Sequence, residues 1–168
     1  MVQVNRSPTR VAWPAAWPAT IASGLVLGLV LAPPFLALEG RTLLSYVFSL
    51  LCHQLTERTL HLDGIPLAAC SRCVGIYAGL FLGTFLYRGG TWSAQFADAH
   101  ARWMILASVS VPGFDWIAGW AGFWDSGHLG RILTGLVFGL IAGTYLARGV
   151  AALRRRSAHQ SWAHAEPR

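Results

Sequence analysis

Four apolar segments of about membrane length constrain this chain more than any other feature. They run from Thr20 to Leu38, from Ser71 to Tyr87, from Arg102 to Phe123 and from Leu129 to Ala147. A bilayer core about 30 Å thick needs roughly 20 apolar helical residues, because every backbone polar group must be satisfied inside the helix. Only 12% of the 168 residues are charged, which is too few to cover a water-soluble globule of this size. The sequence therefore predicts an all-α, polytopic membrane protein built as a four-helix transmembrane bundle.

The first segment also has the position of a cleaved signal peptide, because Arg6 and Arg10 precede it. Its apolar run is long for a signal peptide, and residues 36–38 do not form a small-x-small cleavage site. We therefore expect a retained helix that is kinked near Pro33 and Pro34.

The arginines predict the orientation of the chain, which contains no lysine. Four spans place both termini on the same side of the membrane. That side would hold most of the arginines, namely Arg6, Arg10, Arg88, Arg102, Arg148, Arg154, Arg155, Arg156 and Arg168. The other side would hold Arg41, Arg58, Arg72 and Arg131. The positive-inside rule then puts both termini in the cytoplasm and the cysteine-containing loop outside. A run of arginines beside a span meets anionic lipid, so no nucleic-acid partner is expected.

The predicted organisation has three parts. Residues 1–19 form a cytoplasmic tail, residues 20–148 form the four-span membrane domain, and residues 149–168 form a basic, disordered cytoplasmic tail. The expected partner is the lipid bilayer of the cell membrane. A homo-oligomer is compatible with this sequence, and the sequence identifies no small-molecule ligand.

An internal repeat relates the second and fourth segments. Glycines 75, 79 and 83 recur sixty positions later as glycines 135, 139 and 143. The pattern predicts two helical hairpins related by an axis along the membrane normal. Glycines four residues apart line one helix face and allow close approach of another backbone, so these helices are expected at the centre of the bundle. The simpler interpretation is that the glycines serve packing alone.

An insertion between the first two segments holds all three cysteines. Residues 41–51 are apolar but too short to span a membrane, which suits a helix lying in the interface. Asp63-Gly64 predicts a turn, and Pro66 follows it before Cys70. The insertion therefore brings reactive side chains to the start of the second apolar segment.

The residues of this insertion carry a resemblance. The features are Cys52-His53-Gln54, Glu57-Arg58, a Gly-x-Pro turn, and Cys70-Ser71-Arg72-Cys73 followed by Gly-Ile-Tyr. Together they resemble an uncharacterised family of small bacterial membrane proteins, catalogued as domain of unknown function 2085. The resemblance covers about residues 45–148. It implies a membrane fold and no particular activity.

The thiols allow a metal site. Cys52, Cys70 and Cys73 with one histidine would complete a Cys3His tetrahedral site for zinc, of which a Cys-x-x-Cys pair is the usual half. His53 is the first candidate for the fourth ligand, although adjacent side chains on regular backbone point in different directions. His61 and His128 are the alternatives. An iron–sulfur cluster would need the same ligands, but an exposed extracytoplasmic position suits it less.

Two other uses of the thiols stay open. In an oxidising compartment, Cys52 could pair with Cys70 or Cys73 in a disulfide that fastens the insertion. A redox site would instead use Cys70 and Cys73 catalytically, with Arg72 and the helix N-terminus lowering the thiol pKa. This arrangement is similar to four-helix disulfide oxidoreductases that use a quinone, although those relay electrons through two cysteine pairs. The sequence decides neither among these uses nor whether the protein is an enzyme.

One carboxylate lies well inside the third apolar segment. Asp115 needs a partner there, because an ionisable group at this depth is costly. We expect an ion pair with Arg131, which begins the fourth segment from the same side. Arg72 has a nearly equivalent place in the first hairpin. Such a pair either holds two helices together or marks a pathway or ligand site.

Overall fold

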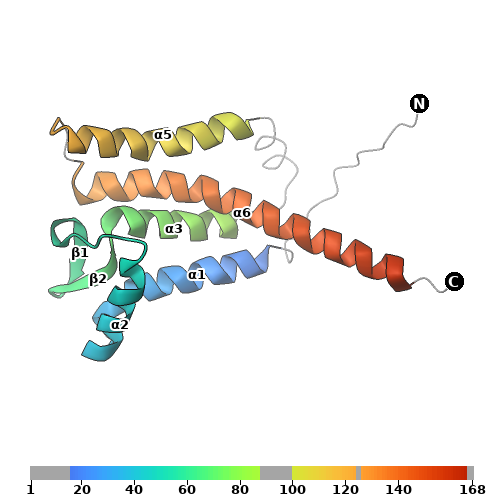
Figure 1. Cartoon of the computed structure of the whole chain (residues 1–168), viewed down its shortest axis with the longest axis horizontal. Helices are drawn as coiled ribbons and strands as arrows, with labels where there is room; N and C mark the ends of the chain where they lie inside the picture. The colour runs from blue at the N-terminus through green and yellow to red at the C-terminus, as the bar shows by residue number, and fades with distance from the viewer. Residues whose placement is uncertain (1–15, 88–99, 124–125, 166–168) are drawn as a thin grey trace.

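A computed structural model describes residues 16–87, 100–123 and 126–165 (Figure 1). Arg6, Arg10, Arg88 and Arg168, which contribute to the predicted orientation, lie outside these residues. The described helices are α1 (Trp17–Leu31), α2 (Leu38–Ser49), α3 (Ser71–Leu86), α5 (Ala101–Trp120) and α6 (Gly127–Ala165). The strands β1 (Thr59–Leu62) and β2 (Ile65–Cys70) precede α3, and two 3-10 turns cover Pro33–Phe35 and Thr56–Arg58.

The four longer helices lie side by side in the order α1, α3, α6, α5 (Figure 1). Helices α3 and α6 run in the same direction, while α1 and α5 run in the opposite direction. The hairpin and α2 gather at the end where α3 and α6 begin. The far part of α6 projects beyond the other helices at the opposite end.

The predicted four-span bundle is wrong. Among the described residues, only the stretch Gly127–Arg154 of α6 is both long and apolar enough to cross a membrane, judged by length and composition. Helix α1 has 15 residues and α3 has 16, which gives them lengths of about 22 and 24 Å, short of a core about 30 Å thick. Helix α5 has 20 residues, but Pro112 and Asp115 interrupt its apolar sequence.

The prolines explain why the first apolar segment is shorter than predicted. Helix α1 ends at Leu31, and Pro33–Phe35 forms a 3-10 turn before α2 starts at Leu38. A proline lacks the N–H that would continue the helical hydrogen bonding. The two prolines therefore end the helix instead of kinking it, and the remainder of the segment turns into α2.

The prediction of an all-α fold is also wrong, because β1 and β2 form a two-stranded antiparallel sheet. Leu62 pairs with Ile65 across a two-residue turn at Asp63 and Gly64, whose φ angles are 51° and 76°. Positive φ at both central residues is typical of a tight hairpin turn. The sequence therefore indicated the turn correctly but not the short strands beside it.

The close packing predicted for the glycine-rich helices is confirmed. A Cβ added at Gly79 would lie 2.3 Å from the Leu136 carbonyl oxygen, and one at Gly139 would lie 2.1 Å from the Ile76 carbonyl oxygen. Such contacts are impossible without moving a backbone. On the other side of α3, the Thr84 and Ser23 hydroxyls share a hydrogen bond of 3.0 Å, which links α3 to α1.

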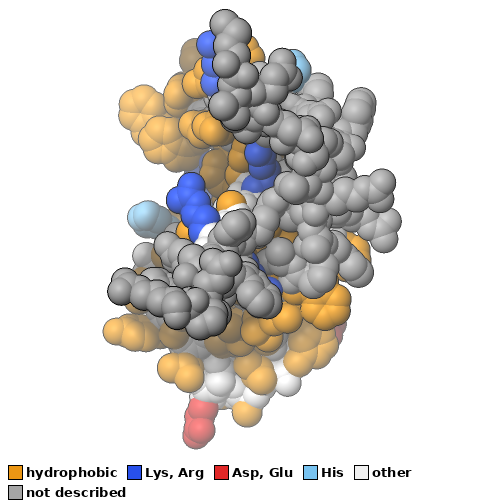
Figure 2. All heavy atoms as spheres, turned by 90° about the vertical axis from the view of Figure 1, so that its right-hand side faces the viewer, with side chains coloured by type: hydrophobic (Ala, Val, Ile, Leu, Met, Phe, Trp, Pro, Cys, Tyr) orange, Lys and Arg blue, Asp and Glu red, His pale blue; other side chains and the backbone are white. Residues whose placement is uncertain are grey.

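Helix α6 continues to Ala165, so its last turns extend into residues 149–168, the predicted cytoplasmic tail. Figure 2 views the molecule from the end toward which α6 projects, and hydrophobic side chains cover much of its described flanks, with arginines among them. Large apolar side chains are widely exposed along the helices, for example Leu25 of α1 at 64% and Phe114 of α5 at 76%. Apolar surface of this extent indicates contact with lipid or with another protein.

Candidate metal centre and arginine pocket

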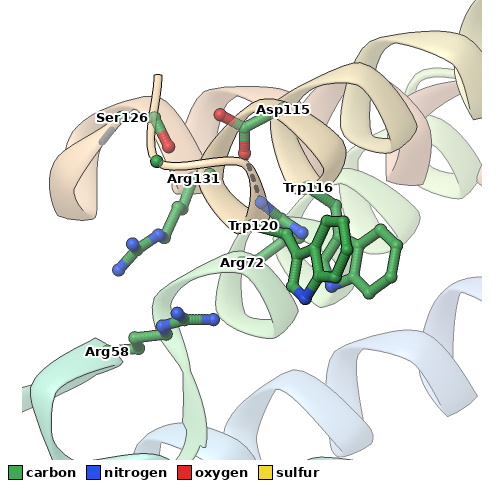
Figure 3. Close-up of a pocket in the computed structure, with 9 residues that line it drawn as sticks. Arg58, Arg72, Asp115, Trp116, Trp120, Ser126 and Arg131 are labelled. Carbon is green, nitrogen blue, oxygen red and sulfur yellow. Dashed lines mark hydrogen bonds and ion pairs between the residues drawn. The ribbon is translucent and has the colours of Figure 1, made fainter. Parts of the chain in front are cut away.

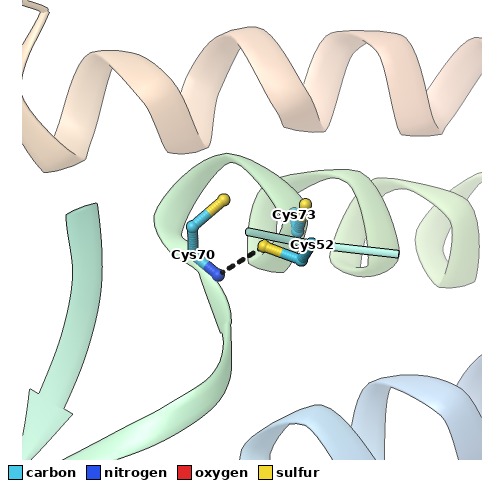
Figure 4. Close-up of side chains that lie close together, drawn as sticks. All are labelled: Cys52, Cys70 and Cys73. Carbon is cyan, nitrogen blue, oxygen red and sulfur yellow. Dashed lines mark hydrogen bonds between the residues drawn. The ribbon is translucent and has the colours of Figure 1, made fainter. Parts of the chain in front are cut away.

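Three structural elements bring the cysteines together. Cys52 follows α2, Cys70 ends β2, and Cys73 lies in the first turn of α3. Their sulfur atoms all lie within 4.8 Å of one another (Figure 4), and all three are free thiols. Cys52 is 6% exposed and packs with Val30, Phe48 and Ala68 in a small core. The thiol cluster therefore belongs to the small core at the end of the molecule where α3 and α6 begin.

Gln54 holds the loop that carries Cys52. Its backbone has a φ of 46°, which turns the chain sharply just after the cysteine. Its side-chain Nε2 donates hydrogen bonds to the Ser45 carbonyl at 2.8 Å and to the Ala68 carbonyl at 2.7 Å. The sequence predicts no role for Gln54, because nothing in the residue spacing shows that one side-chain amide joins α2 to β2.

Hydrogen bonds place negative charge within the cluster. The pKa of Cys52 is lowered from 9.0 to about 2. The largest cause is the hydrogen bond from the Cys70 thiol, the next is that from the Cys73 thiol, and the Cys70 backbone N–H contributes less. That N–H donates to the Cys52 sulfur at 3.3 Å. The pKa of Cys73 is raised mainly by the hydrogen bond between its thiol and Cys52, and to a smaller extent by the hydrogen bond with Cys70. These hydrogen bonds favour the thiolate form of Cys52, which suits a bound cation.

The structure places the histidines outside the thiol cluster. His53, His61 and His128 are all exposed. Within the described ranges, the group of potential metal ligands consists of Cys52, Cys70 and Cys73 alone. His53 lines a cavity of about 410 Å³ beside these thiols, together with Gln54, Arg58 and Arg72. The sequence could place His53 next to Cys52 along the chain, but it could not show where the imidazole points.

Asp115 forms its ion pair with Arg72 (Figure 3). The carboxylate is buried, with 7% of its side chain exposed, whereas the Arg72 side chain is 22% exposed. Arg131, the partner expected from the sequence, lines the same pocket, and its guanidinium extends away from Asp115 in Figure 3. Because α3 and α6 begin alongside each other, both arginines approach the same part of α5.

The ion pair lines a second cavity, of about 220 Å³, which we call the arginine pocket. Its described lining is shared by α5, the starts of α3 and α6, and the turn before β1. The charged and aromatic members are Arg58, Arg72, Asp115, Trp116, Trp120 and Arg131. Arg58, Arg72 and Trp116 also line the cavity beside the thiols. The thiol cluster and the arginine pocket are therefore neighbours at the same end of the molecule.

The parallel helices with exposed apolar surface, the membrane-length stretch of α6 and the thiol cluster together define a helical membrane protein with a cysteine-lined site. The chain belongs to the family described as a predicted membrane protein of domain of unknown function 2085, and residues 52–145 match that family. An uncharacterized protein of the archaeon Methanocaldococcus jannaschii is 30% identical over 100 residues, which are 60% of this chain and 64% of the relative. The chain therefore spans a little under two thirds of the length of this relative. No solved structure matches the chain.

Proposed function

We propose that the protein binds a metal ion such as zinc through Cys52, Cys70 and Cys73. The observation that supports this function is the mutual approach of three free thiols to within 4.8 Å. In tetrahedral zinc sites the Zn–S distance is about 2.3 Å, so the sulfurs lie about 3.8 Å apart. Shifts of about 1 Å or less would bring the thiols to that spacing. The hydrogen bond from the Cys70 N–H to the Cys52 sulfur would also stabilise a bound thiolate.

The fourth coordination position would face the cavity beside the thiols. His53 lines this cavity and remains our proposal for the fourth ligand, with a rotation of its exposed side chain needed to reach the ion. His61 and His128 are the alternatives, and a water molecule would complete the site if no histidine enters. Three protein ligands plus water are typical of zinc sites that stay open to a substrate.

We propose that the metal site lies on the extracytoplasmic side of the cell membrane. The cysteines lie near the start of α6, whereas Arg154 and Arg156 lie toward its other end. The positive-inside rule favours a cytoplasmic position for the arginine-rich end of a spanning helix. Both chain termini would then be cytoplasmic, since α1 also begins at that end.

Metal content tests the proposed function. We expect the purified full chain, expressed with zinc in the medium, to contain about one zinc per chain, because three thiolates and one further ligand complete a tetrahedral site. Serine is a poor zinc ligand, so Cys52→Ser, Cys70→Ser and Cys73→Ser should each reduce zinc to about a tenth or less. Elemental analysis by mass spectrometry, with protein quantified by amino-acid analysis, measures this ratio.

The matched control is Leu51→Ser, which places a serine at the neighbouring side chain that is 72% exposed. It should retain the wild-type zinc content. His53→Ala and His61→Ala are measured separately, and the variant that loses zinc identifies the histidine that serves as the fourth ligand. Wild-type protein without metal, or equal loss in Leu51→Ser and Cys52→Ser, would contradict the metal function.

A second expected effect concerns Gln54. Gln54→Leu keeps a side chain of similar size but removes both hydrogen bonds to the Ser45 and Ala68 carbonyls. The Cys52 loop should lose its fixed position, so zinc affinity should fall about tenfold or more, as it does when supporting partners of metal ligands are removed. Competition with a chromophoric chelator measures the affinity. Unchanged affinity would show that the loop is held by other contacts.

Thiol–disulfide exchange coupled to a quinone is the second candidate function, favoured by three thiols close enough to exchange a bond. Here Cys70 and Cys73 would be the exchanging pair. Arg72, expected from the sequence to lower their pKa, instead has Asp115 as its ion-pair partner. Thiol oxidation that depends on added quinone, in metal-free protein, would favour this function. A bridge between Cys52 and either partner that resists reduction would favour the purely structural disulfide.

A further inference from the structure

The ion pair between Arg72 and Asp115 joins the turn that carries two of the thiols to a helix that is not its neighbour. Cys70 directly precedes α3 and Cys73 lies in its first turn, so Arg72 stands between them. Helix α6 lies between α3 and α5 (Figure 1), yet the Arg72 side chain reaches Asp115 of α5. Among their described residues, α3 and α5 share no other hydrogen bond or ion pair.

Helix α5 also borders the cavity beside the thiols. Trp116, the residue after Asp115, lines this cavity together with Arg72 and Cys73. The Asp115 side chain is only 7% exposed, so a movement of α5 away from Arg72 would leave a buried carboxylate without its partner, which is costly. The ion pair therefore restrains both the turn that carries two sulfur atoms and the helix beside them.

We propose that Asp115 is a positioning residue for the metal site, and that bound metal in turn strengthens the attachment of α5. This inference rests on the proposed metal function. Asp115 does not touch the ion; it holds Arg72, and Arg72 fixes the first turn of α3, where Cys70 and Cys73 converge. Loss of a group that orients metal ligands typically lowers metal affinity by about 10- to 100-fold. Coupling between two sites is reciprocal, so bound metal stabilises the ion pair by the same factor.

Zinc affinity tests the positioning role, measured in the purified full chain by competition with a chromophoric chelator. Asp115→Asn keeps the shape of the side chain but removes its charge, and it should weaken zinc binding about tenfold. Asp115→Glu, which keeps the charge, should recover part of the affinity. The matched control is Ser110→Ala, because the Ser110 hydroxyl donates to the Leu106 carbonyl of the same helix. It should bind zinc like the wild type.

A double variant guards against loss of the fold. Arg72→Met combined with Asp115→Leu removes the ion pair and leaves no buried charge unpaired, which is often close to neutral for stability. Its zinc affinity should also be about tenfold below that of the wild type, because Arg72 no longer ties the turn to α5. Wild-type zinc affinity in Asp115→Asn or in this double variant overturns the inference.

Hydrogen exchange followed by mass spectrometry tests the reciprocal effect. Zinc should slow amide exchange around Asp115 in the wild type and in Ser110→Ala, but not in Asp115→Asn. The same zinc effect in all three proteins overturns the inference.

A comparison without metal separates this inference from the metal function. In metal-free protein, Asp115→Asn should speed exchange of the amides of residues 75–77, which close the first turns of α3, relative to Ser110→Ala. Wild-type protein that binds no zinc contradicts the metal function, and the positioning of the turn is then judged on this comparison. Equal exchange in the two metal-free variants overturns the positioning role.

Discussion

Replacing Gly139 by alanine is expected to lower the free energy of unfolding by about 1–3 kcal/mol, the usual cost of forcing an extra carbon into a packed interior. The added Cβ would lie 2.1 Å from the Ile76 carbonyl oxygen and 2.8 Å from the Leu80 nitrogen. Both are backbone atoms, so no side chain can move aside to make room. Helices α3 and α6 must separate along part of their length, and neighbouring glycine contacts should loosen with them. Unfolding in detergent, followed by circular dichroism against denaturant, measures the change.

The matched control lies on the same helix. A Cβ added at Gly149 would meet nothing within 4 Å, and alanine is a better helix former than glycine by up to about 1 kcal/mol. Gly149→Ala should therefore be neutral or stabilising. If Gly139→Ala and Gly149→Ala had the same effect on stability, the close approach of α3 and α6 would be contradicted.

The sequence predicted this interface because the relevant information is local and periodic. Glycines at every fourth position on both helices define faces without side chains, and two such faces allow two helix backbones to approach closely. The lengths of the helices were less predictable. Apolar composition continues past Leu31 and hides the end of α1, which is set by two prolines. The apolar segments therefore predicted four spans, although hydrophobicity alone does not determine where a helix stops.

The thiol cluster was also predictable only in part. The Cys-x-x-Cys spacing predicted that Cys70 and Cys73 lie together, because both sit at the start of one helix. The position of Cys52 beside them depends on the loop after α2, which Gln54 fixes through contacts with residues 9 and 14 positions away. No pattern in the sequence encodes these contacts. The strands β1 and β2 are difficult to predict for a related reason, since they are short and Pro66 lies in the second of them.

The partner of Asp115 was the least predictable feature. Arg72 and Arg131 begin parallel neighbouring helices and occupy nearly equivalent places in the sixty-residue repeat. Sequence position therefore cannot choose between them. The choice depends on which side chain reaches the face of α5 that carries the carboxylate, and in the structure this side chain is Arg72.

Replacing Arg72 by methionine is expected to lower the free energy of unfolding by about 3–5 kcal/mol, the range for breaking a buried ion pair by removing one partner. The reason is that Asp115, with 7% of its side chain exposed, would keep its desolvation cost without its partner. Arg131→Met is the matched control, because it removes an arginine from the same pocket but not from the ion pair. Its cost in unfolding free energy should not depend on Asp115, which the double-mutant cycle below tests. Thermal unfolding of the three proteins in the same detergent gives the comparison.

A double-mutant cycle separates the ion pair from other effects of each substitution. Asp115→Leu combined with Arg72→Met removes both charges, and replacing a whole buried pair by apolar side chains is often close to neutral. The double variant should therefore be more stable than Arg72→Met alone, with a coupling energy of about 3 kcal/mol or more between residues 72 and 115. The corresponding cycle between residues 131 and 115 should give a coupling below about 0.5 kcal/mol. A larger coupling with Arg131 than with Arg72 would mean that the carboxylate pairs with the start of α6, as the sequence alone suggested, and that the pairing in the structure is not the one that stabilises the protein.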